Sequence, residues 1–193
     1  MAIFGSGLAV GQASLPVSSP GAPTTVDIDG TPVTVLAATP FQINALVPST
    51  VAPGTHTLQV QSAFGSARQP VLVAALAPAI FLLGSPPLGA IVNPDGTLNA
   101  PGNPAARGQV VVVYATGLGA VSKQGQVSNT TTPVTVVLAG QELPAAFAGL
   151  APGSAGEYQV NVLIPATTPP GLALSLTLKQ GGQLSNTVTL ALQ

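Results

Sequence analysis

One unit of sequence occurs twice in this chain of 193 residues. Residues 3–8 (IFGSGL) return 110 positions later as residues 113–118 (VYATGL), and residues 41–48 (FQINALVP) return 117 positions later as residues 158–165 (YQVNVLIP). The change of offset places an insertion of seven residues in the second copy, around residues 149–157. A repeat of this length corresponds to a whole domain, so the duplication predicts two domains of the same kind.

Each copy consists of short stretches with the alternation typical of β-strands. In residues 55–61 (THTLQVQ), Leu58 and Val60 alternate with polar residues and are expected to face inward. Glycine-containing turn dipeptides separate the stretches, among them Asp29-Gly30, Pro53-Gly54, Asp95-Gly96 and Gly181-Gly182. The pattern predicts an all-β chain of two tandem immunoglobulin-like antiparallel β-sandwiches, over residues 1–80 and 85–193.

The two copies differ at their beginning. The second copy is preceded by a lead-in, residues 78–108, with a predicted hairpin over residues 89–99, and the apolar segment 76–83 is expected to join the domains. The first copy starts inside its opening strand, so it is expected to have a truncated first strand and an exposed apolar edge. Because exposed edges recruit other strands, we expect a homodimer through this edge strand of the first domain.

Charged residues are rare: the chain has four Lys or Arg and five Asp or Glu, 5% of its residues. Hydrophobic residues make up 46%, which together with a net charge of −1 excludes an intrinsically disordered chain. The basic residues are scattered, which excludes a nucleic-acid partner, and no apolar run reaches the ~20 residues of a membrane-spanning helix. So few charges favour an extracellular or cell-surface protein whose export signal lies outside this sequence.

Several motifs resemble a known family. Residues 93–99 (NPDGTLN), 103–108 (NPAARG) and 114–119 (YATGLG) resemble the C-terminal repeat domain of large secreted acidobacterial proteins of the Solibacter type. The first copy resembles the IPT/TIG immunoglobulin-like modules through residues 3–8 and the dipeptide Pro53-Gly54. Together these resemblances cover nearly the whole chain. They imply an immunoglobulin-like fold and an extracellular setting, without an assigned chemistry.

Catalytic candidates are few. His56 is the only histidine, so every serine–histidine–aspartate arrangement must use it. At the repeat offset of 117 its counterpart is Ala173, so the fold does not require a histidine there, and a structural or surface role is the first interpretation. The alternative is a hydrolase: an esterase using His56, or a glycosidase using Glu142 and Glu157, which flank the insertion.

Metal ligands are equally sparse. Zinc is excluded because the chain has one histidine and no cysteine, and no cofactor is predicted. Oxygen ligands at alternating positions make weak calcium candidates of two groups: Asp27 with Asp29, and Asn93 with Asp95 and Asn99. The ordinary interpretation of both groups is a turn whose Asp and Asn side chains bind nearby backbone groups.

The aromatic residues supply the candidate contact. Phe4 and Tyr114 are repeat equivalents, as are Phe41 and Tyr158, which predicts core or interface anchors. Phe64 has no such equivalent and lies at a predicted hairpin tip, so it is the candidate for a ligand or partner contact.

These observations favour a non-catalytic interaction or spacer module of a secreted or cell-surface bacterial protein. The expected partner is another protein or a polysaccharide. An ancillary carbohydrate-binding module is a further alternative, which predicts that Phe64→Ala weakens retention on insoluble polysaccharide.

Overall fold

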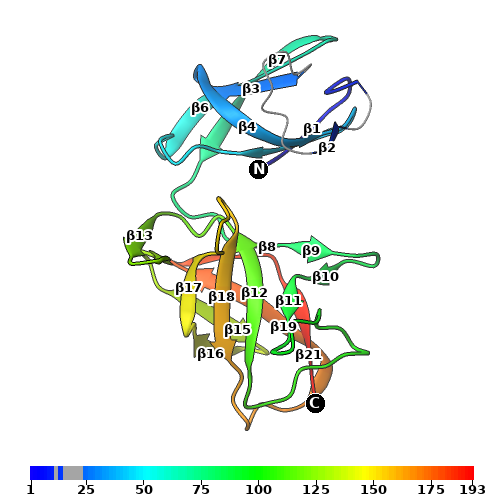
Figure 1. Cartoon of the computed structure of the whole chain (residues 1–193), viewed down its shortest axis with the longest axis vertical. Helices are drawn as coiled ribbons and strands as arrows, with labels where there is room; N and C mark the ends of the chain where they lie inside the picture. Colours follow the sequence, from blue (N-terminus) through cyan, green and yellow to red (C-terminus); the bar gives the residue numbers. More distant parts are fainter. Residues whose placement is uncertain (11–12, 15–23) are drawn as a thin grey trace. The chain divides into compact units, whose positions relative to one another are not determined.

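The chain folds into two compact units, Met1–Ala75 and Leu76–Gln193 (Figure 1). The computed structural model describes residues 1–10, 13–14 and 24–193. Every regular element in these ranges is a β-strand, and all strand pairs within the sheets are antiparallel, so the all-β prediction is confirmed. No helix of the length and hydrophobicity of a membrane span occurs in the described ranges.

The first unit is a sandwich of two layers that share one long strand. Its strands are β1 (Ala2–Phe4), β2 (Ala13–Ser14), β3 (Thr24–Ile28), β4 (Thr31–Ala38), β5 (Gln42–Leu46), β6 (Gly54–Ser62) and β7 (Gly65–Val73). The beginning of β4 pairs with β3, and after an irregularity between Val35 and Ala37 its end pairs with β5. One layer therefore runs β1-β5-β4 and the other β4-β3-β6-β7, with β2 also on β4.

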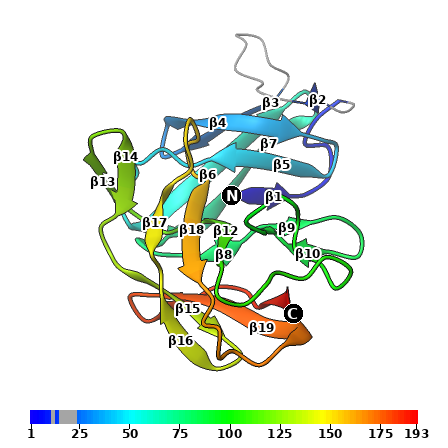
Figure 2. The same cartoon turned by 60° about the horizontal axis from the view of Figure 1, so that its bottom comes forward.

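The second unit is a larger sandwich (Figure 2). One layer contains β11 (Ile91–Val92), β12 (Val110–Thr116), β18 (Tyr158–Leu163), β17 (Phe147–Leu150), β14 (Val127–Thr130) and β13 (Val121–Gln124), with β8 (Ala79–Ile80) also on β12. The other contains β16 (Gln141–Pro144), β15 (Val134–Leu138) and β19 (Gly171–Gln180), with β20 (Gln183–Leu184) and β21 (Val188–Leu192) on β19. A separate hairpin pairs β9 (Leu82–Leu83) with β10 (Leu88–Gly89).

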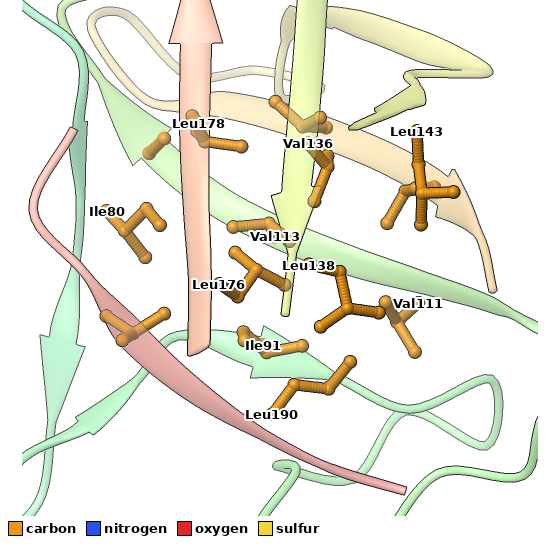
Figure 3. Close-up of a cluster of buried hydrophobic side chains, with 14 of the residues drawn as sticks. Ile80, Ile91, Val111, Val113, Val136, Leu138, Leu143, Leu176, Leu178 and Leu190 are labelled. Atoms are coloured by element: carbon orange, nitrogen blue, oxygen red, sulfur yellow. The ribbon is translucent and has the colours of Figure 1, made fainter. Parts of the chain in front are cut away.

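Alternation along the strands creates a hydrophobic core in each unit. In the first unit, Val26 and Ile28 on β3 face Leu58 and Val60 on β6, and the inward orientation predicted for the latter two is confirmed. In the second unit, branched aliphatic side chains from both layers fill the space between them (Figure 3). These cores hold the layers together because burying a Val, Leu or Ile side chain stabilises a domain by about 1.5–3 kcal/mol.

The pairing register confirms the internal duplication. Ile3 lies opposite Ile43 in the first unit, and Val113 lies opposite Val160 in the second, at the positions given by the offsets of 110 and 117. The turn Asp29-Gly30 recurs as Ala139-Gly140, with all four residues at positive φ, as the two-residue hairpin loop requires.

One part of the alignment needs correction. Val26 pairs with Val60 in the first unit, and its counterpart Val136 pairs with Leu178 in the second. Leu178 is therefore the counterpart of Val60, so the repeat offset in this part of β19 is 118 positions and not 117. The cause is a register irregularity between Gly171 and Leu174. The counterpart of His56 is therefore Leu174 and not Ala173.

The lead-in belongs to the second unit. Ile80, Ile91 and Ala105 are part of its core cluster, and segment 76–83, expected to join the domains, lies wholly within this unit. Val92 forms an antiparallel bridge with Leu98, within the stretch predicted as a hairpin.

Candidate functional site

His56 forms an ion pair with Asp29 at one end of the first sandwich. Asp29 lies in the turn between β3 and β4, and β6 carries His56 beside it. The His56 Nδ1 atom lies 2.7 Å from Asp29 Oδ2, and Nε2 lies 2.8 Å from the carbonyl oxygen of Ala52. The other Asp29 oxygen accepts the backbone N–H of Thr57 at 2.8 Å. The repeat offers no counterpart to this pair, because Ala139 and Leu174 occupy the equivalent positions.

These contacts shift the titration of both groups. The backbone hydrogen bond from Thr57, followed by the hydrogen bond with His56, lowers the pKa of Asp29. The hydrogen bond to Asp29, followed by that to the Ala52 carbonyl, raises the pKa of His56. Both ring nitrogens face oxygen acceptors, so the geometry favours the imidazolium ion, which donates through both. A general base needs a free ring nitrogen, and this arrangement offers none.

The two glutamates lie on different layers of the second unit. Glu142 is on β16 and pairs with Lys179 on β19 of the same sheet, with 2.6 Å between Oε1 and Nζ. Glu157 directly precedes β18 of the other sheet, where its carbonyl oxygen accepts the N–H of Ala151. The structure shows no pairing of the two carboxyl groups of the kind that glycoside hydrolysis uses.

The first pair of calcium candidates forms a turn. Asp27 accepts the N–H of Gly30 through Oδ1 at 2.9 Å, and both oxygens of Asp29 already have hydrogen-bond partners. In the part of the chain that the structure describes, no group of three His, Cys, Asp or Glu residues is placed to hold a metal ion.

The second set of candidates is a hydrogen-bonded network. The Asn99 carboxamide accepts the N–H of Ala191 at 2.8 Å and donates to its carbonyl oxygen at 2.9 Å, which fastens the lead-in to β21. Asn99 also donates to Asn93 Oδ1, and Asp95 accepts the N–H and hydroxyl of Thr97. Each of these three side chains thus has an oxygen that accepts a hydrogen bond from a protein donor.

Phe64 lies at the tip of the β6–β7 hairpin and is 69% exposed. It borders a hollow of about 550 Å³ between the β1 segment and the β6–β7 hairpin. Phe4 borders the same hollow and is 74% exposed. The floor is apolar; it consists of Ile3, Leu8, Leu58 and Val60. Two exposed aromatic rings therefore flank a concave apolar surface in the first unit.

The sequence analysis missed Phe4. Its repeat partner Tyr114 and the pair Phe41 and Tyr158 predicted core or interface anchors, and of these four only Tyr158 lies in the core, where its hydroxyl donates to the Gly119 carbonyl. Phe4 and Phe41 are 74% and 70% exposed, so a core position is wrong for the first copy, and the interface role stays a prediction.

Comparisons with known proteins give only distant likenesses. No protein-family model matches the chain, and no curated protein matches it. A Bacteroides ovatus mixed-linkage glucan utilization locus protein, SGBP-B, in complex with a mixed-linkage heptasaccharide, is 16% identical over 98% of this chain and 43% of its own, with a TM-score of 0.35. This chain thus spans less than half the length of that protein.

Two further structures align along most of the chain. Domains 4 and 5 of the S-layer protein SbsC are 15% identical over 94% of this chain and 78% of their own, with a TM-score of 0.26. A titin tandem of immunoglobulin domains is 11% identical over 88% of this chain and 80% of its own, with a TM-score of 0.29. The assignment to immunoglobulin-like sandwiches therefore stands on the strand order and register described above.

Proposed function

We propose that this chain is a non-catalytic binding module of an extracellular bacterial protein and that its first domain carries the binding surface. The observation that carries the proposal is the hollow between Phe4 and Phe64. Aromatic side chains beside a concave apolar surface are typical anchors of protein interfaces. In the second domain the equivalent side of the sandwich is covered by the lead-in, so the second domain serves as a spacer.

The chemistry of the hollow favours a polypeptide partner. Its floor is aliphatic, and Arg68 is the only charged residue among the described residues that line it. Arg68 is exposed, and its Nε donates to Gln59 Oε1 at 2.7 Å. A partner with branched or aromatic apolar side chains would bury the aliphatic floor while Arg68 keeps its contact with water.

A display experiment tests the proposal. Peptides selected from a random displayed library on the full chain are expected to bind wild type and to lose affinity for Phe4→Ser and Phe64→Ser by about tenfold, as is common for an aromatic anchor. Phe41→Ser is the matched control, because Phe41 is equally exposed but lies outside the hollow. Equal binding to all variants, or failure to select any peptide, would contradict a binding role for the hollow.

Carbohydrate binding is the second candidate. Ser66, Arg68 and Gln69 line the hollow beside Phe64 and could donate hydrogen bonds to sugar hydroxyls while a ring stacks on the sugar. Retention on insoluble cellulose, chitin or xylan, reduced in Phe64→Ala and unchanged in Phe41→Ala, would favour this function over peptide binding.

The hydrolase alternative has the least support. It would need His56 to accept a proton, yet both ring nitrogens face oxygen acceptors. An extracellular location is part of the proposal; the rarity of charged residues and the resemblance to Solibacter-type secreted proteins support it. Wild type and His56→Ala are expected to be equally inactive on ester substrates, and an activity lost in His56→Ala would overturn the non-catalytic assignment.

A further inference from the structure

The second domain shows what covers its opening strand. Ile91 and Val92 of the lead-in pair with Val113 and Val112 of β12. The N–H of Tyr114 donates to the Ala90 carbonyl at 2.9 Å. The outer edge of β12 therefore has partners, and Ile91 is fully buried against the core.

The lead-in also binds β21, at the other edge of the sandwich. Asn99 binds both backbone groups of Ala191. Ala105 donates its N–H to the Ala191 carbonyl oxygen and accepts the N–H of Gln193. Gly89 lies so close to Val188 that a Cβ at Gly89 would be 2.8 Å from the valine side chain. The lead-in thus closes the sandwich along both edges.

In the first domain, β1 pairs with β5 on one side only, among the residues that the structure describes. The N–H of Ala45 donates to Met1, and the N–H of Gly5 donates to Phe41, so the odd-numbered residues face β5. In an antiparallel pair, hydrogen bonding alternates along the strand, so the backbone groups of Ala2 and Phe4 point away from β5. Ala2 and Phe4 are the counterparts of Val112 and Tyr114, the residues of β12 that the lead-in binds.

The side chains show the same difference. Val71 on β7 and Leu190 on β21 occupy equivalent register positions, which makes Leu72 the counterpart of Ala191. Leu72 is 78% exposed, whereas Ala191 is 2% exposed. Ile3, the counterpart of Val113, lines one end of the hollow. Opposite residues of an antiparallel pair project to the same face, so Ile91 fills the place beside this end in the second domain. Ile80, which pairs with Ala115, the counterpart of Gly5, fills the neighbouring place.

We propose that the outer edge of β1 accepts an extended apolar polypeptide strand, antiparallel to β1 and in the register that residues 90–92 have on β12. This inference rests on the proposed function and specifies its partner class. A branched apolar residue of the added strand lies opposite Ile3 and enters the hollow. The backbone groups of the next residue of the added strand pair with those of Phe4. The added strand carries no charged residue where it contacts the aliphatic floor of the hollow.

A peptide with the sequence of residues 88–99 (LGAIVNPDGTLN) provides the probe. Labelled with a fluorophore and titrated with the full chain, it is expected to bind with increased anisotropy. Phe4→Pro removes the outward N–H of β1 but keeps β5 pairing, because that N–H is not used by β5. It is expected to weaken binding by about a hundredfold, about tenfold from the lost ring and about tenfold from the lost hydrogen bond and the blocked edge. Phe4→Ala keeps the N–H and is expected to weaken binding by only about tenfold.

Two controls accompany the titration. A peptide with Ile91→Asp is expected not to bind, because a carboxylate would enter the apolar hollow. Amide exchange at Phe4 is expected to slow in the complex, while the amide of Gly5, already bonded to Phe41, is expected to change little.

Several outcomes would overturn strand addition. Equal losses in Phe4→Pro, Phe4→Ala and Phe64→Ala would indicate contact through the rings alone, which leaves the proposed function intact. Binding unaffected by Phe4→Pro would place the peptide elsewhere, including on the second domain. A chain that light scattering finds dimeric, and that the peptide does not dissociate, would assign the edge to a second copy. Polysaccharide retention without peptide binding would assign the hollow to a glycan.

Discussion

At the scale of single residues, His56 and Asp29 form a pair whose stabilising effect depends on pH. The folded-state pKa of His56 is raised above its usual 6.5, so its contribution is complete below pH 6.5 and is lost as the pH rises through the raised value. The folded-state pKa of Asp29 is lowered below 3.8, so its contribution is present above pH 3.8 and is lost as the pH falls through the lowered value. The pair therefore stabilises the first domain most between about pH 3.8 and pH 6.5.

His56 can be titrated directly because it is the only histidine. In an NMR titration of the full chain, we expect its imidazole signals to report a pKa above 6.5. In Asp29→Asn we expect the pKa to fall back toward about 6.5, since the main hydrogen-bond acceptor loses its charge. Asparagine tolerates the positive φ at position 29, so the turn is retained. A pKa at or below 6.5 in wild type would contradict the ion pair.

Asn99 has a structural role in the second domain. Asn99→Ala removes the partner of the Ala191 N–H and of Asn93 Oδ1, both in buried surroundings, while the Ala191 carbonyl keeps the N–H of Ala105. We expect the free energy of unfolding to fall by about 3 kcal/mol, the cost of leaving such groups unsatisfied. Asn129→Ala is the control, because its 3.4 Å hydrogen bond to Gln124 is exposed; there we expect a change below about 0.5 kcal/mol. Both tyrosines lie in the second domain, so denaturation followed by tyrosine fluorescence measures it.

At the scale of elements, the duplicated strand ends differ in what they contact. Gly7 and Gly117 are counterparts and both have positive φ. A Cβ at Gly117 would lie 1.9 Å from the backbone oxygen of Ala77, at the beginning of the second domain. A Cβ at Gly7 would lie 3.4 Å from the Phe64 side chain, close to ordinary contact. Glycine at this repeat position is therefore needed in the second copy for the close approach of the Ala77 backbone, and in the first copy only for its backbone conformation.

This difference predicts unequal effects of alanine. Gly117→Ala is expected to destabilise the second domain by roughly 3 kcal/mol or more, because the backbone at Ala77 must move. Gly7→Ala is expected to cost the first domain about 1 kcal/mol, from the left-handed conformation alone. Tyrosine fluorescence follows the former variant, and the His56 NMR signal follows the latter through thermal unfolding. Similar losses in both variants would contradict the close approach at Ala77.

At the scale of the whole molecule, each unit has its own core. All buried residues of the larger cluster lie between Ile80 and Leu192, and those of the smaller cluster lie before residue 61. The lead-in supplies Ile80, Ile91 and Ala105 to the larger cluster. The second domain therefore contains in one stretch, residues 76–193, both its sandwich and the segment that closes it.

A truncation series follows from this organisation. Residues 76–193 are expected to unfold cooperatively when followed by tyrosine fluorescence and to show a β-type far-ultraviolet circular dichroism spectrum. Residues 109–193, which lack the lead-in, are expected to lose roughly 4 kcal/mol from two buried isoleucines alone, and more from the Asn99 bonds. Equal unfolding midpoints for the two fragments would show that the lead-in does not stabilise the sandwich.

Much of the fold followed from local pattern. Alternation along residues 55–61 predicted which side chains of β6 are buried, and the glycine dipeptides predicted the turns, because both depend on neighbours within a few residues. The offset error at His56 arose from an irregularity in β19 that adds one residue without a sequence signal. The NPDGTLN stretch was correctly interpreted as a turn, but its bonds to Ala191, 92 residues away from Asn99, could not be predicted from spacing.

The sequence by itself determined the duplication and the β class, since both depend on periodicity and on matching residues between the copies. Only the tertiary structure decided which equivalent positions are covered. Phe4 and Tyr114 occupy the same place in their strands, but Tyr114 has the lead-in beside it, whereas Phe4 has β5 on one side and no strand on the other among the described residues. Exposure depends on what packs alongside a strand, and that neighbour comes from a distant part of the chain or from another molecule.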